Sequence, residues 1–451
     1  MLRGWKKTGQ TAVSIGYFIT LLTLFAYIAI QGPIVTAKIG PSSNSILRNN
    51  LFPFSLADMG LLNSPAFGMI DFASQIILGF LSAYLIARTF QELFDLSVVA
   101  TLLVTLVFLS PYYSPLVFGV HVINNGYAYP VFLLTVRYLL RGLIFKEFSS
   151  YLLFFFFTAI AIILRRQFVF LPVVGIAALV YSLIFDYEEF YGKKIFLGLA
   201  LLASIFLPDL SERYANYLKT GQFVSIPFVG FQMAVTPLYV SKVDDVNLFT
   251  SKPELANMFL AIRQPLAAEG LTQDVAERQE DIPLMRRYRN FFETYETIAY
   301  GKLKPLIEGI SRENPALVDE GLITLAMGLI FANFGQYFLI YLHNIIYHMG
   351  GYFMTVLFLL IFITSFIYHI QYKGRFSLVS LVITFLAFSN YILVALLEPV
   401  TQEYGFYTDS FTQALLLALI AFLFRTQRGK TQMNEESPES QRNWRGVEKP
   451  T

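Results

Sequence analysis

The chain has 451 residues, of which 55% are hydrophobic and only 14% are charged, with 45 Phe and 27 Tyr. Ordinary soluble domains carry about 25% charged residues, so this composition excludes an array of water-soluble domains and indicates a polytopic membrane protein. The sequence contains no cysteine, which excludes disulfides, thiolate metal sites and cysteine nucleophiles.

Apolar runs long enough for a helix to cross a ~30 Å hydrocarbon core predict an all-α fold with about ten transmembrane helices. The first run follows Arg3, Lys6 and Lys7 and is too long for a cleavable signal peptide, so we expect a retained span. The predicted spans lie near residues 11–31, 70–88, 97–111, 126–145, 149–164, 168–185, 194–207, 350–371, 376–397 and 408–424.

Charged residues concentrate in residues 208–320, which hold 28 of the 64 charges and have a formal charge of −4. We expect one large aqueous loop region here, between membrane segments. The following stretch, 321–347, is apolar but interrupted by polar residues such as Asn333, Gln336 and His343. Polar backbone at membrane depth needs protein or water around it, so we expect interfacial or re-entrant helices.

The distribution of Lys and Arg predicts the orientation. With ten spans and a cytoplasmic N-terminus, fourteen Lys and Arg fall on the inner side and four on the short outer loops. The chain then divides into an N-terminal membrane domain (1–207, with a first outer loop at 32–69), an extracytoplasmic region (208–349), C-terminal membrane helices (350–425) and a disordered cytoplasmic tail (426–451). We expect an integral protein of a bacterial inner (plasma) membrane with both termini in the cytoplasm.

Two carboxylates at the outer face are candidate catalytic residues. Asp58 lies in the first outer loop, where a partly desolvated carboxylate could take a proton from an attacking hydroxyl. A helix cap or a solvated side chain is the alternative. Asp71 is the weaker candidate, because it precedes the second span in a position typical of a residue that caps free N–H groups.

Arg165 and Arg166 form an unusual pair, because positive charge is disfavoured on the outer side where they end the fifth span. Two guanidinium groups at headgroup depth can bind a phosphate or pyrophosphate with paired hydrogen bonds. The alternative is that both side chains extend to lipid headgroups.

The outer loop before the fourth span is uncharged but rich in hydrogen-bonding groups. Tyr113, His121, Asn124 and Asn125 could contact a neutral polar ligand such as a sugar. An aromatic belt at the membrane interface with a turn at Asn124-Asn125-Gly126 is the alternative. The four histidines have no metal-ligand spacing, and no phosphate-binding P-loop, GxSxG or HExxH motif occurs. Nothing in the sequence predicts a nucleic-acid partner.

Several of these features together resemble a known family. They are Asp58 in the first outer loop, the run from Pro65 to Arg88, Asn124-Asn125-Gly126 at the fourth span, Arg165-Arg166 before a new span, and Gly221-Gln222-Phe223 in the long outer block. In layout, residues 1–240 resemble the GT-C superfamily of integral membrane glycosyltransferases.

The resemblance implies transfer of a sugar from a polyprenyl-phosphate carrier on the outer leaflet to a lipid, glycan or protein acceptor. It implies Asp58 as the base and Arg165 and Arg166 on the carrier phosphate. A divalent cation held by Asp58 and that phosphate would fit, although no residue pattern requires one. The alternatives are a polymerase or ligase of glycans linked to polyprenyl pyrophosphate, and a non-enzymatic glycolipid transporter or membrane scaffold.

Overall fold

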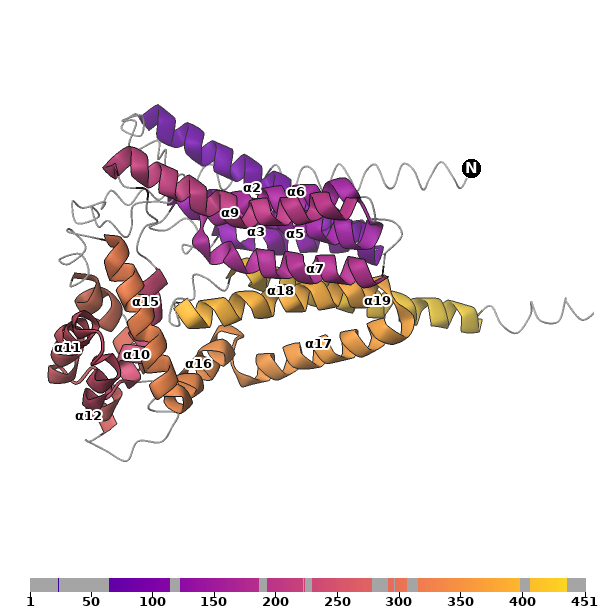
Figure 1. Cartoon of the computed structure of the whole chain (residues 1–451). Helices are drawn as coiled ribbons and strands as arrows, with labels where there is room; N and C mark the ends of the chain where they lie inside the picture. The colour runs from indigo at the N-terminus through magenta and orange to yellow at the C-terminus, as the bar shows by residue number, and fades with distance from the viewer. Residues whose placement is uncertain are drawn as a thin grey trace, which may run out of the picture.

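The computed structural model describes residues 23, 65–113, 122–185, 193–221, 223, 229–277, 291–295, 297–305, 315–397 and 406–435. Every regular element among these residues is a helix. Nine long or apolar helices run side by side and form a bundle (Figure 1). They are α2 (Pro65–Phe94), α3 (Val98–Leu109), α5 (Val122–Phe145), α6 (Phe148–Leu164), α7 (Phe170–Phe185), α9 (Lys194–Thr220), α17 (Tyr352–Tyr372), α18 (Arg375–Leu397) and α19 (Phe406–Glu435).

A second group of helices gathers at one end of the bundle (Figure 1). This end unit consists of α10 (Val229–Val240), η6 (Val243–Phe249), α11 (Pro253–Ala268), α12 (Gln273–Glu277), η7 (Thr297–Leu303), α15 (Pro315–Ala332) and α16 (Phe334–His348). It has its own apolar core, in which Leu238, Phe259 and Leu325 are buried. We call the adjoining end of the bundle the unit end and the opposite one the far end.

The helices of the bundle follow the apolar runs of the sequence. Six of them are long and apolar enough to cross a membrane, by length and composition. These candidate spans are Ala73–Phe94, Gly126–Phe145, Arg166–Phe185, Ile195–Leu218, Tyr352–Tyr372 and Arg375–Leu396, and Val98–Tyr112 and Phe148–Leu164 are shorter apolar helices. The described residues therefore confirm an all-helical chain with several candidate spans, whereas the count of about ten stays a prediction.

Two predicted boundaries differ from the structure. The predicted span 194–207 belongs to α9, which continues through Pro208 to Thr220. Two ion pairs hold this extension: Arg213 Nε lies 2.7 Å from Asp209 Oδ2 one turn earlier, and Glu212 pairs with Arg166. The last helix, α19, continues to Glu435, beyond the predicted end at 424. The predicted first span, 11–31, lies outside the described residues except for Thr23.

The stretch predicted to be interfacial or re-entrant forms two helices. The chain bends by 104° between Val318–Ala332 and Phe334–His348. Asn333 lies at the bend, and its Nδ2 donates to Asp245 Oδ2 at 2.8 Å, which ties the bend to η6. This geometry is that of a broken span or a re-entrant segment rather than one straight transmembrane helix.

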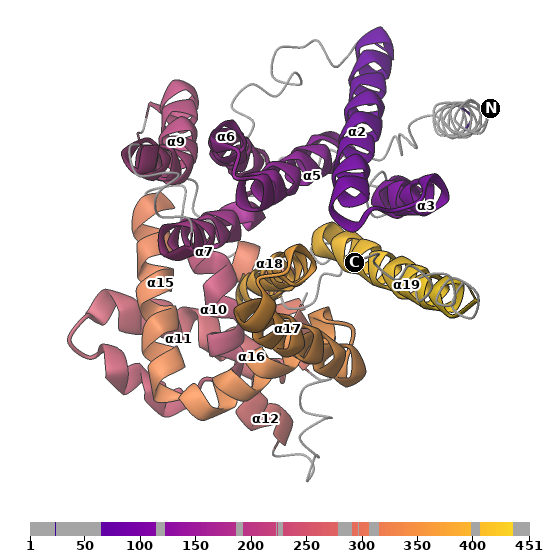
Figure 2. The same ribbon diagram turned by 90° about the vertical axis from the view of Figure 1, so that its right-hand side faces the viewer.

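Packing brings helices that are distant in sequence together. Figure 2 views the bundle from the far end and shows α5 beside both α2 and α6, the helices that it contacts most extensively. Helix α18 contacts α7, α16, α17 and α19. Because α18 touches both the bundle and the end unit, it connects the two cores.

Candidate functional site

The candidate site at the unit end begins where the chain passes from α6 to α7. Helix α6 ends at Leu164, and Arg165 is extended, with φ −156° and ψ 116°. A short 3-10 turn, η4 (Arg166–Val169), then leads into α7. Three consecutive polar residues, Arg165, Arg166 and Gln167, therefore lie between two apolar helices.

The first turn of α19 supplies four consecutive polar residues to the same place. The Nη1 atom of Arg165 donates to Tyr407 Oη at 3.0 Å, and the guanidinium carbon lies 5.4 Å from the centre of the Tyr407 ring. On another side of this turn, Asn390 Nδ2 of α18 donates to Thr408 Oγ1 at 3.2 Å. The turn thus receives contacts from the start of α7 and the end of α18.

The next two residues of α19 complete the network. Tyr391 Oη donates to Asp409 Oδ1 at 2.5 Å. Tyr129 Oη of α5 lies 3.1 Å from Ser410 Oγ and donates to the carbonyl of Phe108 at 2.8 Å. Four helices, α3, α5, α18 and α19, therefore meet in one hydrogen-bonded cluster.

This network is buried. Tyr129, Asn390 and Tyr407 are fully buried, and Gln167 donates from Nε2 to Asn390 Oδ1 at 2.8 Å. A polar group costs free energy when it leaves water without a partner, so an interior of this kind is stable only when its donors and acceptors are matched. The cluster holds hydroxyl and amide groups in fixed positions beside the Arg165 guanidinium.

The two arginines of the predicted phosphate-binding pair have different surroundings. Arg166 forms an ion pair with Glu212 of α9, whose side chain is only 4% exposed. Arg165 instead lies against the Tyr407 ring and hydroxyl. Glu212 neutralises the charge of Arg166, whereas Arg165 contacts Tyr407, so the two guanidinium groups have different partners.

The end unit approaches this region through α10 and α16, which contact α18, and α10 is held in turn by Asp319 of α15. The backbone N–H of Gly230 donates to Asp319 Oδ1 at 2.8 Å, at the start of α10. A Cβ at position 230 would lie 2.4 Å from the Asp319 carbonyl oxygen, so the close approach of α10 and α15 requires glycine here. Arg166 and Glu212 lie within electrostatic reach of Asp319. Asp319 therefore ties α15 to α10 close to the Arg166 ion pair.

The other predicted site residues are placed only in part. Asp58 and His121 lie outside the described residues. The structure gives the backbone but not the side chains of Asp71, Tyr113, Asn124 and Asn125. Asp71 lies inside α2, which begins at Pro65, so Asp71 is not the residue that caps this helix. Tyr113 ends η3 (Ser110–Tyr113), and Asn124 and Asn125 lie in the first turn of α5.

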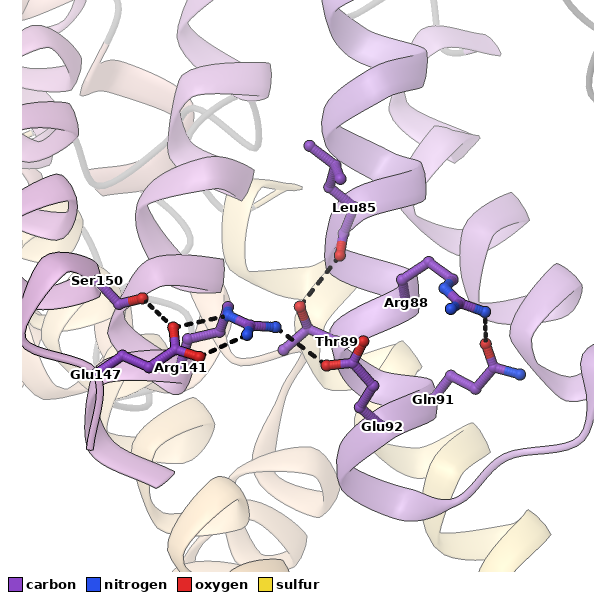
Figure 3. A network of polar contacts seen from close by, with 8 residues as sticks. All are labelled: Leu85, Arg88, Thr89, Gln91, Glu92, Arg141, Glu147 and Ser150. Carbon is purple, nitrogen blue, oxygen red and sulfur yellow. Dashed lines mark hydrogen bonds and ion pairs between the residues drawn. The ribbon is translucent and has the colours of Figure 1, made fainter. Parts of the chain in front are cut away.

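A charged network at the far end contrasts with this site (Figure 3). Arg141 of α5 binds Glu147 with two hydrogen bonds, of 2.6 and 3.1 Å, and Glu92 of α2 at 3.0 Å. Ser150 donates to Glu147 at 2.6 Å. The hydrogen bonds from Arg141, with that from Ser150, hold the pKa of Glu147 below its usual value. This network closes the turn between α5 and α6 and ties it to α2.

Within the described residues, no group of three or more His, Asp or Glu side chains could hold a metal ion. No protein-family model, curated protein or solved structure matches the chain. Function is therefore inferred from the residues and their geometry.

Proposed function

We propose that the chain is an integral membrane glycosyltransferase. It transfers a sugar from a polyprenyl-phosphate carrier to a lipid, glycan or protein acceptor at the unit end of the bundle. One observation supports this best: Arg165 lies beside a buried cluster of hydroxyl, amide and carboxyl groups at the end of a bundle of apolar helices. A carrier with apolar tails and a phosphate head needs this combination of apolar and cationic surfaces.

Each proposed role follows from the chemistry of sugar transfer from a lipid phosphate. Negative charge develops on the phosphate as the sugar leaves, and a fixed guanidinium stabilises it. Arg165 has this role, whereas Arg166 holds α9 in place through Glu212. Asp58 removes the proton from the acceptor hydroxyl.

Further residues contribute to the same reaction. Tyr113, His121, Asn124 and Asn125 contact the sugar or the acceptor, and Asp71 is a second candidate base. The proposal requires no metal, although Asp58 and the phosphate could share a divalent cation.

The proposal includes a topology of ten spans with both termini in the cytoplasm of a bacterium. The positions of the cations at the far end support this topology. Lys193 lies over the Phe148 ring and Lys373 over the Phe185 ring, at the same end as Arg141. Cytoplasmic loops are enriched in Lys and Arg, so the far end faces the cytoplasm and the unit end faces the outer side.

The test uses the purified full chain in vesicles, with a radiolabelled polyprenyl-phosphate sugar and a range of acceptors. We expect labelled product from the unchanged chain. Arg165→Gln should lower kcat/KM by about a hundredfold, since loss of one charge-stabilising donor costs roughly that factor. Arg213→Gln is the matched control, because within the described part of the chain Arg213 pairs with the exposed Asp209 one turn away. Asp58→Asn should abolish transfer without lowering the amount of folded protein.

The other outcomes identify the alternatives. Transfer of a whole glycan from a pyrophosphate-linked donor, with no reaction of the monophosphate donor, would make the chain a polymerase or ligase. Movement of labelled glycolipid across the vesicle membrane without chemical change would make it a transporter. Full activity of Arg165→Gln would refute the phosphate-binding role of Arg165.

A further inference from the structure

The segment that runs from the end unit through α17 has an unusual composition. Residues 321–372 contain no Asp, Glu, Lys or Arg. This segment includes most of α15 and all of α16, which belong to the end unit, as well as α17, which is a candidate span. A helix surrounded by water normally carries charged residues on its outer face, so the composition raises the question of what covers α16.

Helix α16 has two distinct faces. One face packs on the end of α18: Tyr341 Oη donates to the Ile392 carbonyl at 3.0 Å, and Asn344 Nδ2 donates to the Ala395 carbonyl at 3.4 Å. The opposite face is exposed and apolar, and it is formed by Phe334, Phe338 and Leu342. The rings of Phe334 and Phe338 are stacked with their centres 5.6 Å apart. These residues recur every four positions and therefore form one stripe.

Another helix of the same unit has the surface expected for water. Helix α11 buries Leu255 and Phe259 in the core of the end unit. Its exposed residues include Glu254, Asn257 and Gln264. The apolar stripe is thus a property of α16 and not of the end unit as a whole.

A candidate membrane span follows α16 directly. Gly350 and Gly351, with φ of 87° and 92°, form the short connection from α16 to α17. The first residues of α17, including Tyr352 and Phe353, are exposed, and only 11% of this span is buried. His343 Nε2 of α16 lies 3.2 Å from Tyr352 Oη, which ties α16 to the start of α17. If α17 crosses the bilayer, α16 therefore lies directly beside the membrane, joined to it by a connection that carries no charged residue.

We propose that the stripe Phe334–Phe338–Leu342 of α16 lies in the bilayer interface at the unit end and binds the end unit to the lipid surface. The 104° bend at Asn333 turns the chain from α15 into this amphipathic helix. Amphipathic helices lie in the interface with the apolar face among the upper acyl chains and the polar face toward headgroups or protein. In α16 the polar atoms of Tyr341 and Asn344 face α18 instead of headgroups. This inference does not rest on the proposed glycosyltransferase function.

The chain has no native cysteine, so a single introduced cysteine carries a label without other substitutions. The experiment places a nitroxide spin label at Phe338→Cys in the full chain, reconstituted in phospholipid vesicles. Accessibility to oxygen, which dissolves in lipid, is compared with accessibility to a water-soluble nickel chelate. Ile363→Cys on the exposed face of α17 is the lipid control, and Asn257→Cys on α11 is the water control.

We expect the label at position 338 to resemble that at 363, with high accessibility to oxygen and low accessibility to the chelate. High chelate accessibility, as at 257, would overturn the proposal because the stripe would then lie in water. Low accessibility to both reagents would also overturn it, since protein would then cover the stripe. Leu342→Cys provides a second position on the same stripe if Phe338→Cys does not fold.

Discussion

The two ends of the helical bundle use the same residue type in opposite ways. At the far end, Arg141 binds Glu92 and Glu147, whose side chains are 44% and 34% exposed. At the unit end, Arg165 contacts a tyrosine beside a buried hydrogen-bonded cluster, and Arg166 pairs with the buried Glu212. Exposed ion pairs contribute little to stability, whereas buried polar groups are costly unless they are satisfied. The unit end is therefore where removal of one partner should cost the most stability.

Glu212→Gln should give the largest loss of stability and so sharpen this difference. The substitution leaves Arg166 beside a neutral partner in a mostly buried place, which costs about 3 kcal/mol. The measurement is thermal unfolding of the detergent-solubilised chain. Glu92→Gln at the far end is the control and should cost roughly 0.5 kcal/mol. Equal losses at the two ends would contradict the comparison.

Gly230→Ala should have the next largest effect. The added methyl group meets the Asp319 backbone oxygen, and overpacking of this kind costs about 1–3 kcal/mol. Gly198→Ala in α9 is the matched control, because among the described residues no side chain and no other helix lies within 4 Å of its added Cβ and alanine favours a helix. A stability gain in both variants would show that α10 and α15 can separate without loss.

The contribution of Glu147 to folding stability should depend on pH. It should stay below about 1 kcal/mol, because the pair of Glu147 with Arg141 is partly exposed. The folded-state pKa of Glu147 is lowered, so its stabilising effect is present above the unfolded-state pKa of about 4.3 and is lost as the pH falls through the folded-state value. The melting temperatures of the unchanged chain and Glu147→Gln should therefore differ at pH 7 and converge as the pH falls through the lowered pKa of Glu147. A constant difference would exclude this linkage.

Lys373→Gly should have the smallest effect and the opposite sign. Lys373 ends α17 with φ 49°, a left-handed conformation that costs a side-chain-bearing residue about 1–2 kcal/mol. Glycine removes this cost but adds unfolded-chain entropy, for a net gain of roughly 0.5 kcal/mol. Thermal unfolding of the detergent-solubilised variant measures this gain. A loss of stability would mean that the cation–π contact of Lys373 with Phe185 outweighs the backbone strain.

The apolar runs of the sequence predicted helix positions well, because a span-length apolar segment has few alternatives. The predicted spans 126–145 and 376–397 correspond closely to α5 and α18. The sequence did not reveal that α9 continues past Pro208, because Asp209, Glu212 and Arg213 resemble the start of an aqueous loop. The apolar residues Leu210, Tyr214 and Leu218, at helical spacing among these charges, were the signal that could have indicated it.

The polar cluster at the unit end was harder to predict for a different reason. Ser410 and Tyr129 are 281 positions apart, and Gln167 and Asn390 are 223 apart. Each is a common polar residue in an apolar helix, and no local pattern marks its partner. Of the predicted pair, Arg165 contacts this cluster through Tyr407 of α19, whereas Arg166 pairs with Glu212 of α9, and only the tertiary structure brings these helices to the pair.

The length of α9 has a consequence for the surrounding membrane. The part of α9 that could cross a membrane, Ile195–Leu218, has 24 residues and is about 36 Å long at 1.5 Å per residue, and its last turns carry Asp209, Glu212 and Arg213. The hydrocarbon core of a typical bilayer is only about 30 Å thick, so an α9 that crosses it would tilt, thicken the lipid next to it or place its charged turns at the interface. Glu212 lies near the end of this portion. We therefore expect the Arg166–Glu212 pair to be strained more in a thin bilayer and less in a bilayer of lipids with longer acyl chains.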